Sequence, residues 1–315
     1  MRFFFALLAL AASLTSARAQ TVTVEARTQE SQWTISYEGK PVLVYAFDPQ
    51  KFKPYVKALN TLEGEGPLRD APGDHLHHHA LMYGINVNGV NFWEEKSGCG
   101  VQKVVESTPP EIGSDADGRP QARLRQVLYW LAPADAFLPK SNAPALLIEH
   151  RTLVLTLDAA ARETALQWTS EFEVGTKTNR VTLTGANYDG LGMRFLVELD
   201  AAATHLTPAG PLDLSNKRQD VSALPWEAVA FDRPRAPLTI ALYGAAGNAR
   251  GESRFFAMKE PFAYLCATQG LDKEALVYQR GEHFVLNYLV VLYPDMKTKD
   301  ALDARGRQWK AASAR

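Results

Sequence analysis

Four of the seven histidines of this 315-residue chain fall within positions 75–79, directly after Asp74. Imidazole is the commonest metal-binding side chain and the one whose proton moves near neutral pH. If this run is extended, the side chains of His75, His77 and His79 share one face and that of His78 lies on the other. So many imidazoles in one short run predict a functional site.

Two chemistries and one structural role fit this cluster. In the first, His75, His77 and His79 bind a divalent metal ion, with Asp74 as a further ligand or as the partner that orients an imidazole. In the second, one imidazole is a general acid or base and others hydrogen-bond a polar substrate, without a metal. In the third, the histidines only cap strands and stack on aromatic rings. We favour the metal-free chemistry; the sequence identifies no cofactor, and a divalent metal is the alternative.

Charged residues also interrupt an apolar run at positions 146–154. Glu149 and Arg151 lie there two positions apart, so they share one face of the expected strand. Unpaired burial of either charge is costly, so the two form a structural ion pair or belong to a site on an open sheet face. We take the following as candidate catalytic residues: His75, His77, His78, Glu149 and Arg151.

Other polar and aromatic residues surround the cluster in the sequence. An Asn88-Gly89 dipeptide between apolar residues is a strong hairpin signal, and it brings Trp93 back toward the histidines. Trp93 is either a core residue or a platform on which a sugar ring stacks. The candidate substrate-binding residues are Lys53, Tyr55, Arg69, Asp70, Asp74, Trp93, Arg194 and His283.

Strand patterns separated by short turns occupy most of the chain. In 165–174, for example, Leu166, Trp168 and Phe172 alternate with polar residues, as in a half-buried strand. Parallel sheets need a crossover helix for each strand pair, and no such helices are expected here. We therefore expect an all-β fold, a large antiparallel two-sheet sandwich of supersandwich or jelly-roll type with few helices. It forms a single domain over residues 20–297, and the polar segment 298–315 is a terminal helix or a frayed tail.

The first residues have the form of an export signal. A positive start at Arg2 precedes an apolar run and the small-x-small sequence that ends at Ala19. We expect residues 1–19 to be a signal peptide cleaved near Ala19, and the mature protein to be periplasmic or secreted. No later stretch is long and apolar enough to predict a membrane span. Cys99 and Cys266 form one disulfide or remain two buried thiols.

The charge balance argues against one class of partner. The chain has 34 Lys and Arg residues against 35 Asp and Glu residues, a formal net charge of -1. Proteins that bind nucleic acid usually carry a basic surplus, because neutralising phosphates supplies much of the affinity. We therefore expect no nucleic acid partner, and a small-molecule or oligosaccharide substrate instead.

Several short stretches resemble one bacterial family. The segments 52–55 (Phe-Lys-Pro-Tyr), 68–70 (Leu-Arg-Asp), 74–78 and 87–93 (Val-Asn-Gly-Val-Asn-Phe-Trp) are similar to the PmoA-like, or "methane oxygenase PmoA", family. Leu76 replaces the proline of the family pattern, and His79-Ala80 replaces Arg-Gly, so the chain resembles a divergent member. The resemblance implies an exported β-sandwich protein of the kind met beside carbohydrate-degrading genes. It does not imply methane oxidation, because the true enzyme subunit crosses the membrane many times.

Together these observations predict an exported enzyme that acts on a sugar or sugar-derived substrate. Histidine and carboxylate groups would move protons, as lyases, epimerases and hydrolases do. A non-catalytic carbohydrate-binding module is the main alternative, with aromatic rings stacked on sugars. A metal-dependent oxygenase, suggested by the family's title and the imidazoles, is the other.

Overall fold

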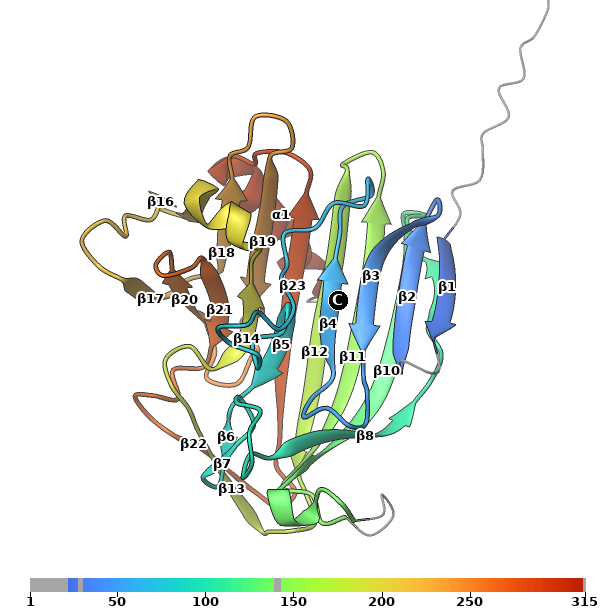
Figure 1. Cartoon of the computed structure of the whole chain (residues 1–315), viewed down its shortest axis with the longest axis vertical. Helices are drawn as coiled ribbons and strands as arrows, with labels where there is room; N and C mark the ends of the chain where they lie inside the picture. The colour runs from blue at the N-terminus through green and yellow to red at the C-terminus, as the bar shows by residue number, and fades with distance from the viewer. Residues whose placement is uncertain (1–21, 28–30, 139–142, 314–315) are drawn as a thin grey trace, which may run out of the picture.

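The computed structural model describes residues 22–27, 31–138 and 143–313, and the expected signal peptide lies outside these ranges. Within them, two large β-sheets face each other and a third, small sheet closes one end (Figure 1). All their ladders are antiparallel, which confirms the predicted antiparallel two-sheet sandwich with few helices. None of the helices in the described ranges is both long and apolar enough to cross a membrane.

The first large sheet has nine strands. Their spatial order is β1 (Val22–Arg27), β2 (Gln32–Tyr37), β3 (Lys40–Ala46), β4 (Tyr55–Leu59), β5 (Leu81–Gly84), β14 (Gly190–Arg194), β21 (Tyr264–Thr268), β20 (Arg254–Met258) and β17 (Gln219–Ala223). Strands from distant parts of the chain are thus neighbours in its centre, where β5 pairs with β14 and β14 with β21.

The second large sheet has ten strands. Along its main path they are β16 (Gly210–Pro211), β15 (Ala203–Thr207), β18 (Trp226–Phe231), β19 (Leu238–Gly244), β23 (His283–Tyr293), β12 (Glu163–Val174), β11 (Leu147–Asp158), β10 (Pro120–Leu131) and β8 (Val101–Ser107), while β9 (Glu111–Ser114) also pairs with β10. The long strands β10, β11, β12 and β23 form the back of the molecule in the view of Figure 1.

The small sheet contains the predicted hairpin. Its strands are β22 (Leu276–Gln279), β13 (Arg180–Thr184), β6 (Asn86–Val87) and β7 (Val90–Asn91). Asn88 and Gly89 link β6 to β7 with φ angles of 51° and 77°, the conformation that this turn requires. Two short 3-10 helices, η2 (Pro133–Asp135) and η4 (Val197–Ala202), lie in connections.

The main core fills the space between the large sheets. In β12, Leu166, Trp168 and Phe172 are buried there, as their alternation predicted, while Glu171 on the opposite face is exposed. Cys99 and Cys266 are both buried and are not joined.

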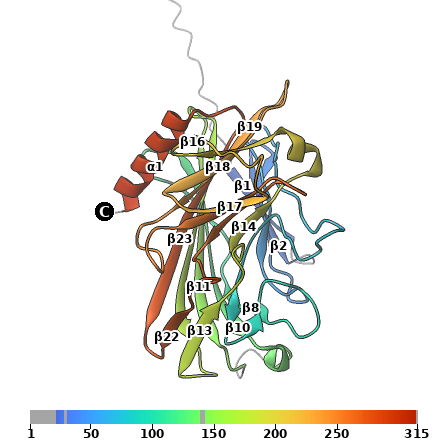
Figure 2. The same cartoon turned by 90° about the vertical axis from the view of Figure 1, so that its left-hand side faces the viewer.

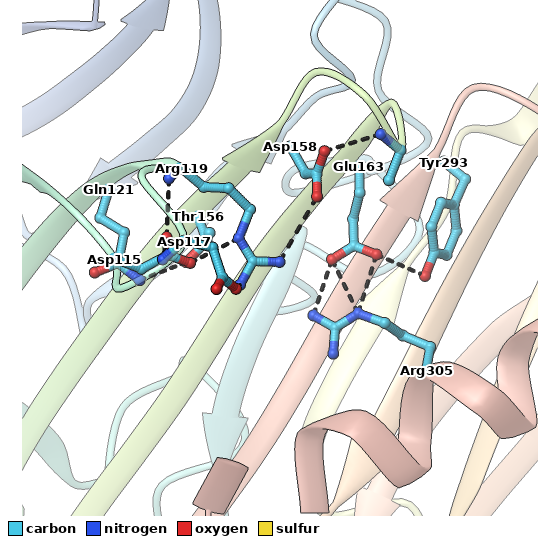
Figure 3. Close-up of polar contacts among 10 residues, drawn as sticks. Asp115, Asp117, Arg119, Gln121, Thr156, Asp158, Glu163, Tyr293 and Arg305 are labelled. Carbon is cyan, nitrogen blue, oxygen red and sulfur yellow. Dashed lines mark hydrogen bonds and ion pairs between the residues drawn. The ribbon is translucent and has the colours of Figure 1, made fainter. Parts of the chain in front are cut away.

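A terminal helix covers part of the outer face of the ten-stranded sheet (Figure 2). This helix, α1 (Lys299–Ser313), packs Leu302 and Trp309 against apolar side chains of that sheet. Arg305 donates three hydrogen bonds of 2.8–3.0 Å to the Glu163 carboxylate, which also accepts one from the Tyr293 hydroxyl (Figure 3). The polar segment after residue 297 is therefore docked onto the sandwich.

The outer face of the nine-stranded sheet carries a second cluster of buried side chains. In β14, Met193 faces the core, and the neighbouring Gly192 and Arg194 therefore face outward. Around them lies the outer cluster: Ala46, Tyr55, Met82, Trp93, Phe256, Met258, Phe262, Tyr264 and Cys266. Connections, not a helix, cover this face, and one of them carries the histidine run.

Candidate functional site

Three of the four clustered histidines line a pocket of about 350 Å³ over this outer face. We call it the histidine pocket. Its lining residues are His75, His77, His78, Trp93, Glu94, Tyr188, Arg218, Gln219, Phe256, Met258, Phe262 and Tyr264. Some come from three connections, which precede β5, follow β7 and precede β14. The others come from the start of β17, from β20 and β21, and from the turn between β20 and β21. Segments far apart in the sequence thus build one site.

The histidine run is a succession of turns, not a strand. The backbone N–H of His78 donates to the carbonyl of His75 at 2.9 Å, which folds the run back on itself. As a result His75, His77 and His78 meet, with the ring of His78 4.5 Å from each of the other two, centroid to centroid. The predicted alternation, with His79 beside His75 and His77, is wrong because it assumed extended backbone.

His79 lies on the other side of the run, away from the pocket lining. Its Nδ1 is 2.6 Å from Oδ1 of Asp70, its Nε2 is 3.0 Å from Oε1 of Glu95, and its ring stacks on Tyr55 at 3.7 Å. Burial lowers the pKa of His79, but the hydrogen bonds to the two carboxylates outweigh it and raise the pKa overall. Both ring nitrogens are therefore N–H donors, and neither is free to bind a metal. The metal set His75, His77 and His79 is wrong for this reason.

Three of the predicted substrate-binding residues belong to the same framework. Lys53 is buried and donates from Nζ to the Trp93 carbonyl at 2.7 Å and to Glu95 at 2.9 Å. Tyr55 donates its hydroxyl to Asp70. Burial favours the neutral form of Glu95, but His79 and Lys53 outweigh it and lower the pKa of Glu95 to about 2. Lys53, Tyr55 and Asp70 thus hold Trp93 and the histidine run in place from behind the pocket.

His78 is the most enclosed imidazole of the pocket, with 7% of its surface exposed. Burial, followed by the charges of His77 and His75, lowers its pKa to about 3. Burial also lowers the pKa of His77. The Nδ1 atom of His78 has no hydrogen-bond partner among the described residues. A neutral imidazole with an unengaged nitrogen can exchange a proton with a bound ligand.

Aromatic rings form the floor and walls. The Tyr264 ring is stacked near that of His78 at 5.7 Å, and Trp93 meets His78 edge-on at 5.9 Å. In the described part of the chain, neither Nε1 of Trp93 nor the Tyr264 hydroxyl has a hydrogen-bond partner. A side chain at Gly192 would collide with the Tyr264 hydroxyl and lie 3.2 Å from the Trp93 ring. Glycine is needed there because these two rings occupy the space above β14.

Two carboxyl groups that the sequence analysis did not select lie at this site. Glu94 lines the pocket, half-buried, and forms an ion pair with the exposed Lys96. Asp189 is buried next to Tyr188, and desolvation raises its pKa to about 7. Glu94 could have been selected by its position beside Trp93. No local pattern marks Asp189, whose environment comes from other segments.

Asp74 and Arg194 are brought together beside the pocket. Arg194 is buried, donates from Nη2 to Asp74 at 3.0 Å, and lies 3.2 Å from the centre of the Phe262 ring. Asp74 also pairs with Nδ1 of His75 at 3.0 Å. Arg69 is in the same region, because its backbone N–H donates to the Arg194 carbonyl. Asp74 and Arg194 therefore orient His75 and Phe262.

The structure places the other two catalytic candidates elsewhere. Glu149 and Arg151 face inward from β11 and form a buried ion pair, with Nε of Arg151 2.7 Å from Glu149. Glu149 further accepts hydrogen bonds from Trp130 and Ser170. Their hydrogen-bonding groups are occupied inside the core, so these residues act as an ion pair between the sheets, not in the histidine pocket.

His283 is also separate from the pocket. It is exposed at the start of β23, opposite Glu173 in the ladder with β12, in the other large sheet. Among the described residues, no group of three or more His, Cys, Asp or Glu side chains is arranged to hold a metal ion. The histidine pocket is thus a concave site lined by three imidazoles, aromatic rings and the Glu94 carboxylate.

A solved structure shares this fold at low sequence identity, and two others resemble it more weakly. A "putative aldose 1-epimerase" from Klebsiella pneumoniae aligns over 94% of this chain and 88% of its own, with 10% identity and a TM-score of 0.51. The galactosidase domain of an alpha-galactosidase-sucrose kinase aligns over 86% of this chain, with 12% identity and a TM-score of 0.48. An alpha-galactosidase from Lactobacillus brevis aligns over 88%, with 8% identity and a TM-score of 0.45. This chain spans only 41% and 40% of those last two.

At 10% identity the likeness to the first of these structures shows the fold alone. No curated protein sequence matches the chain. The sequence pattern of one family matches residues 32–306, which include every residue of the histidine pocket. The chain therefore belongs to the family of unknown function DUF6807.

Proposed function

We propose that this protein is an exported enzyme that moves protons on a sugar or sugar-derived substrate in the histidine pocket. One observation carries the proposal: the pocket places the imidazoles of His75, His77 and His78 beside the aromatic rings of Trp93, Tyr188 and Tyr264. A sugar has hydroxyl groups around its edge and C–H groups on its faces. It would hydrogen-bond the imidazoles and the Glu94 carboxylate while packing on the rings.

An epimerase-type reaction at the anomeric carbon fits these residues best. A base takes the proton of the anomeric hydroxyl while an acid protonates the ring oxygen, so that the C1–ring oxygen bond breaks and a carbonyl forms. Rotation about C1–C2 and closure by the reverse transfers give the other anomer. We assign the base and acid roles to His78 and His77, which lie edge to face. His77 gives its proton from the imidazolium form. Burial, followed by the charges of Lys53 and His75, lowers the pKa of His77 overall, and the Glu94 carboxylate partly offsets this.

The number of carboxyl groups favours the epimerase-type reaction over glycoside hydrolysis. Glycoside hydrolysis usually needs two carboxyl groups across the scissile bond. Glu94 is the carboxylate among the described lining residues, and Asp189 lies buried behind Tyr188. The fold shared with the "putative aldose 1-epimerase" supports the choice by analogy. A sugar lyase would use the same histidines.

The test is the rate at which freshly dissolved α-glucose and α-galactose reach anomeric equilibrium, followed by polarimetry. We expect the wild type to accelerate at least one sugar, and His78→Ala to lose about 100-fold, the usual effect of one general acid or base. His150→Ala is the matched control, because His150 is exposed on β11 in the other large sheet. No acceleration of any sugar by the wild type, or full activity in His78→Ala, would overturn the epimerase proposal.

A carbohydrate-binding module is the second candidate. Tyr188 is 41% exposed at the pocket and lies 5.9 Å from Trp93, ring to ring, so these rings could hold a sugar without chemistry. Binding of sugars by the wild type with no turnover of any of them would favour this function.

Export and the resemblance to the PmoA-like family are also part of the proposal, and each has its own test. Export predicts that protein from the periplasmic or secreted fraction begins near Gln20, which N-terminal sequencing tests. The PmoA-like resemblance is consistent with an exported protein of the β-sandwich type. The oxygenase suggested by that family's title needs a bound metal, so elemental analysis of untagged protein without stoichiometric copper, iron or zinc would exclude it.

A further inference from the structure

A second, larger hollow of about 810 Å³ lies beside the histidine pocket. It is enclosed by β15, by the turn 259–261 between β20 and β21, and by the connection 212–218. That connection leads from β16 at the edge of the ten-stranded sheet to β17 at the edge of the nine-stranded sheet (Figure 1, left). We call it the edge hollow. Both hollows fall in the size range of small-molecule sites.

The two hollows share a wall. Arg218 lines both of them. Met258 and Phe262 line the histidine pocket, and the residues between them, 259–261, line the edge hollow. The two hollows are therefore neighbours, with Arg218 and the segment 258–262 between them.

A buried, hydrogen-bonded pair of side chains, His205 and Glu227, lies at the edge hollow, which His205 lines. His205 is 2% exposed in β15. Its Nδ1 is 2.8 Å from Glu227, and its Nε2 is 3.2 Å from the carbonyl of Met258. Both nitrogens face acceptors, so the ring ties the edge hollow to the wall of the histidine pocket.

The lining of the edge hollow suits a neutral, hydroxyl-rich ligand. Thr204, Asn216 and Lys259 supply a hydroxyl, an amide and an ammonium group, none with a side-chain hydrogen bond to the described residues. The lining carries three basic side chains, Lys217, Arg218 and Lys259, against the acidic Asp213 and Glu260. Lys217 is paired with Asp220, which lies outside the lining, so little positive charge remains to hold a polyanionic ligand.

We propose that the edge hollow is a second sugar subsite, so that the substrate is an oligosaccharide whose terminal residue enters the histidine pocket and whose next residue contacts Asn216 and Lys259. This inference rests on the proposed function and narrows its substrate class. The subsite would select chain ends over free monosaccharides, because each added sugar gains hydrogen bonds from these polar side chains.

The experiment compares affinities by isothermal titration calorimetry. The probes are glucose and galactose, and their α- and β-linked di- and trisaccharides. We expect the wild type to bind at least one oligosaccharide about 10-fold or more tightly than its monosaccharide, an increment that one or two hydrogen bonds supply. The double variant Asn216→Ala/Lys259→Ala should remove that preference. Lys273→Ala, at an exposed lysine after β21, is the matched control and should keep it.

The outcomes separate this inference from the proposed function. Equal affinity for monosaccharides and all oligosaccharides, or a preference that survives in the double variant, overturns the subsite and leaves the histidine pocket as a monosaccharide site. Loss of all sugar binding in His78→Ala, with the oligosaccharide preference removed only by the double variant, supports both. If the wild type binds none of the probes, the proposed function itself fails.

Discussion

The imidazole rings of His75 and His78 lie nearly parallel, with their centroids 4.5 Å apart and their planes 25° from each other. Two charged imidazoles at this distance would repel each other in a partly dry site. The pKa of His78, lowered to about 3 by burial and then by His77 and His75, reflects this constraint. His78 therefore presents a neutral imidazole near pH 7, the form that can accept a proton.

Replacing His79 should destabilise the protein without touching the pocket lining. In His79→Ala, two acidic partners, Asp70 and Glu95, lose their shared cation, and the stack on Tyr55 is lost. We expect a loss of about 3 kcal/mol in the free energy of unfolding, as for one partner of a buried ion pair. Urea denaturation followed by tryptophan fluorescence measures it. The exposed His150→Ala should change the midpoint little, and equal effects in the two variants would contradict this role.

The same ion pair predicts a pH window for stability. The pKa of His79 is raised on folding, so its contribution is full below about 6.5 and is lost as the pH rises through the folded value. The pKa of Glu95 is lowered to about 2, so its contribution is full above about 4.5 and is lost as the pH falls toward 2. Stability from this network should thus be greatest between roughly pH 4.5 and 6.5. In His79→Ala, the free energy of unfolding should fall less steeply as the pH rises above about 6.5. Urea denaturation at a series of pH values measures this.

Asp189 should oppose folding at high pH. Desolvation raises its pKa to about 7, so the folded state holds the proton more tightly than the unfolded chain does. Stability then falls as the pH rises from about 4 to 7, and Asp189→Asn should recover on the order of 3 kcal/mol at pH 8 but little at pH 4. Thermal unfolding at the two pH values tests this sign. A variant that is less stable than wild type at pH 8 would show that ionised Asp189 is stabilised by its surroundings.

Replacing Tyr264 should partly restore the stability that a methyl group at Gly192 removes. In Gly192→Ala, the new methyl group meets the Tyr264 hydroxyl and approaches Trp93, so both rings of the pocket floor must move. We expect a loss of about 1–3 kcal/mol in stability and weaker sugar binding. The double variant Gly192→Ala/Tyr264→Phe removes the atom that is struck first, so part of the stability should return. No recovery in the double variant would mean that the backbone of β14, not the ring, resists the methyl group.

Glu149 and Arg151 should matter for stability but not directly for chemistry. Arg151→Ala leaves Glu149 buried without its cation, at an expected loss of about 3–5 kcal/mol in unfolding free energy. Any folded variant should keep the wild-type affinity for the sugar that the histidine pocket binds. Titration calorimetry at low temperature, where the variant is still folded, measures sugar affinity separately from stability. Weaker binding by folded Arg151→Ala would show that these residues contribute to the site.

Local patterns in the sequence determined the strands, the Asn88-Gly89 hairpin and the presence of a site at the histidine run. These features depend on backbone preferences and on alternation with a period of two, both of which act between near neighbours. The same alternation placed Glu149 and Arg151 on one strand face but could not say whether that face met water or the other sheet.

Only the tertiary structure decided which imidazoles share a pocket. Successive turns at 71–80 replaced the expected strand, because β5 begins only at Leu81, and so His79 was directed toward Asp70 and Glu95. Tyr188, Arg218 and Phe262 reach the site from distant segments whose pairing in the sheet leaves no mark in their local sequence. Burial and neighbouring charge, which set the pKa of each group, exist only once those segments have come together.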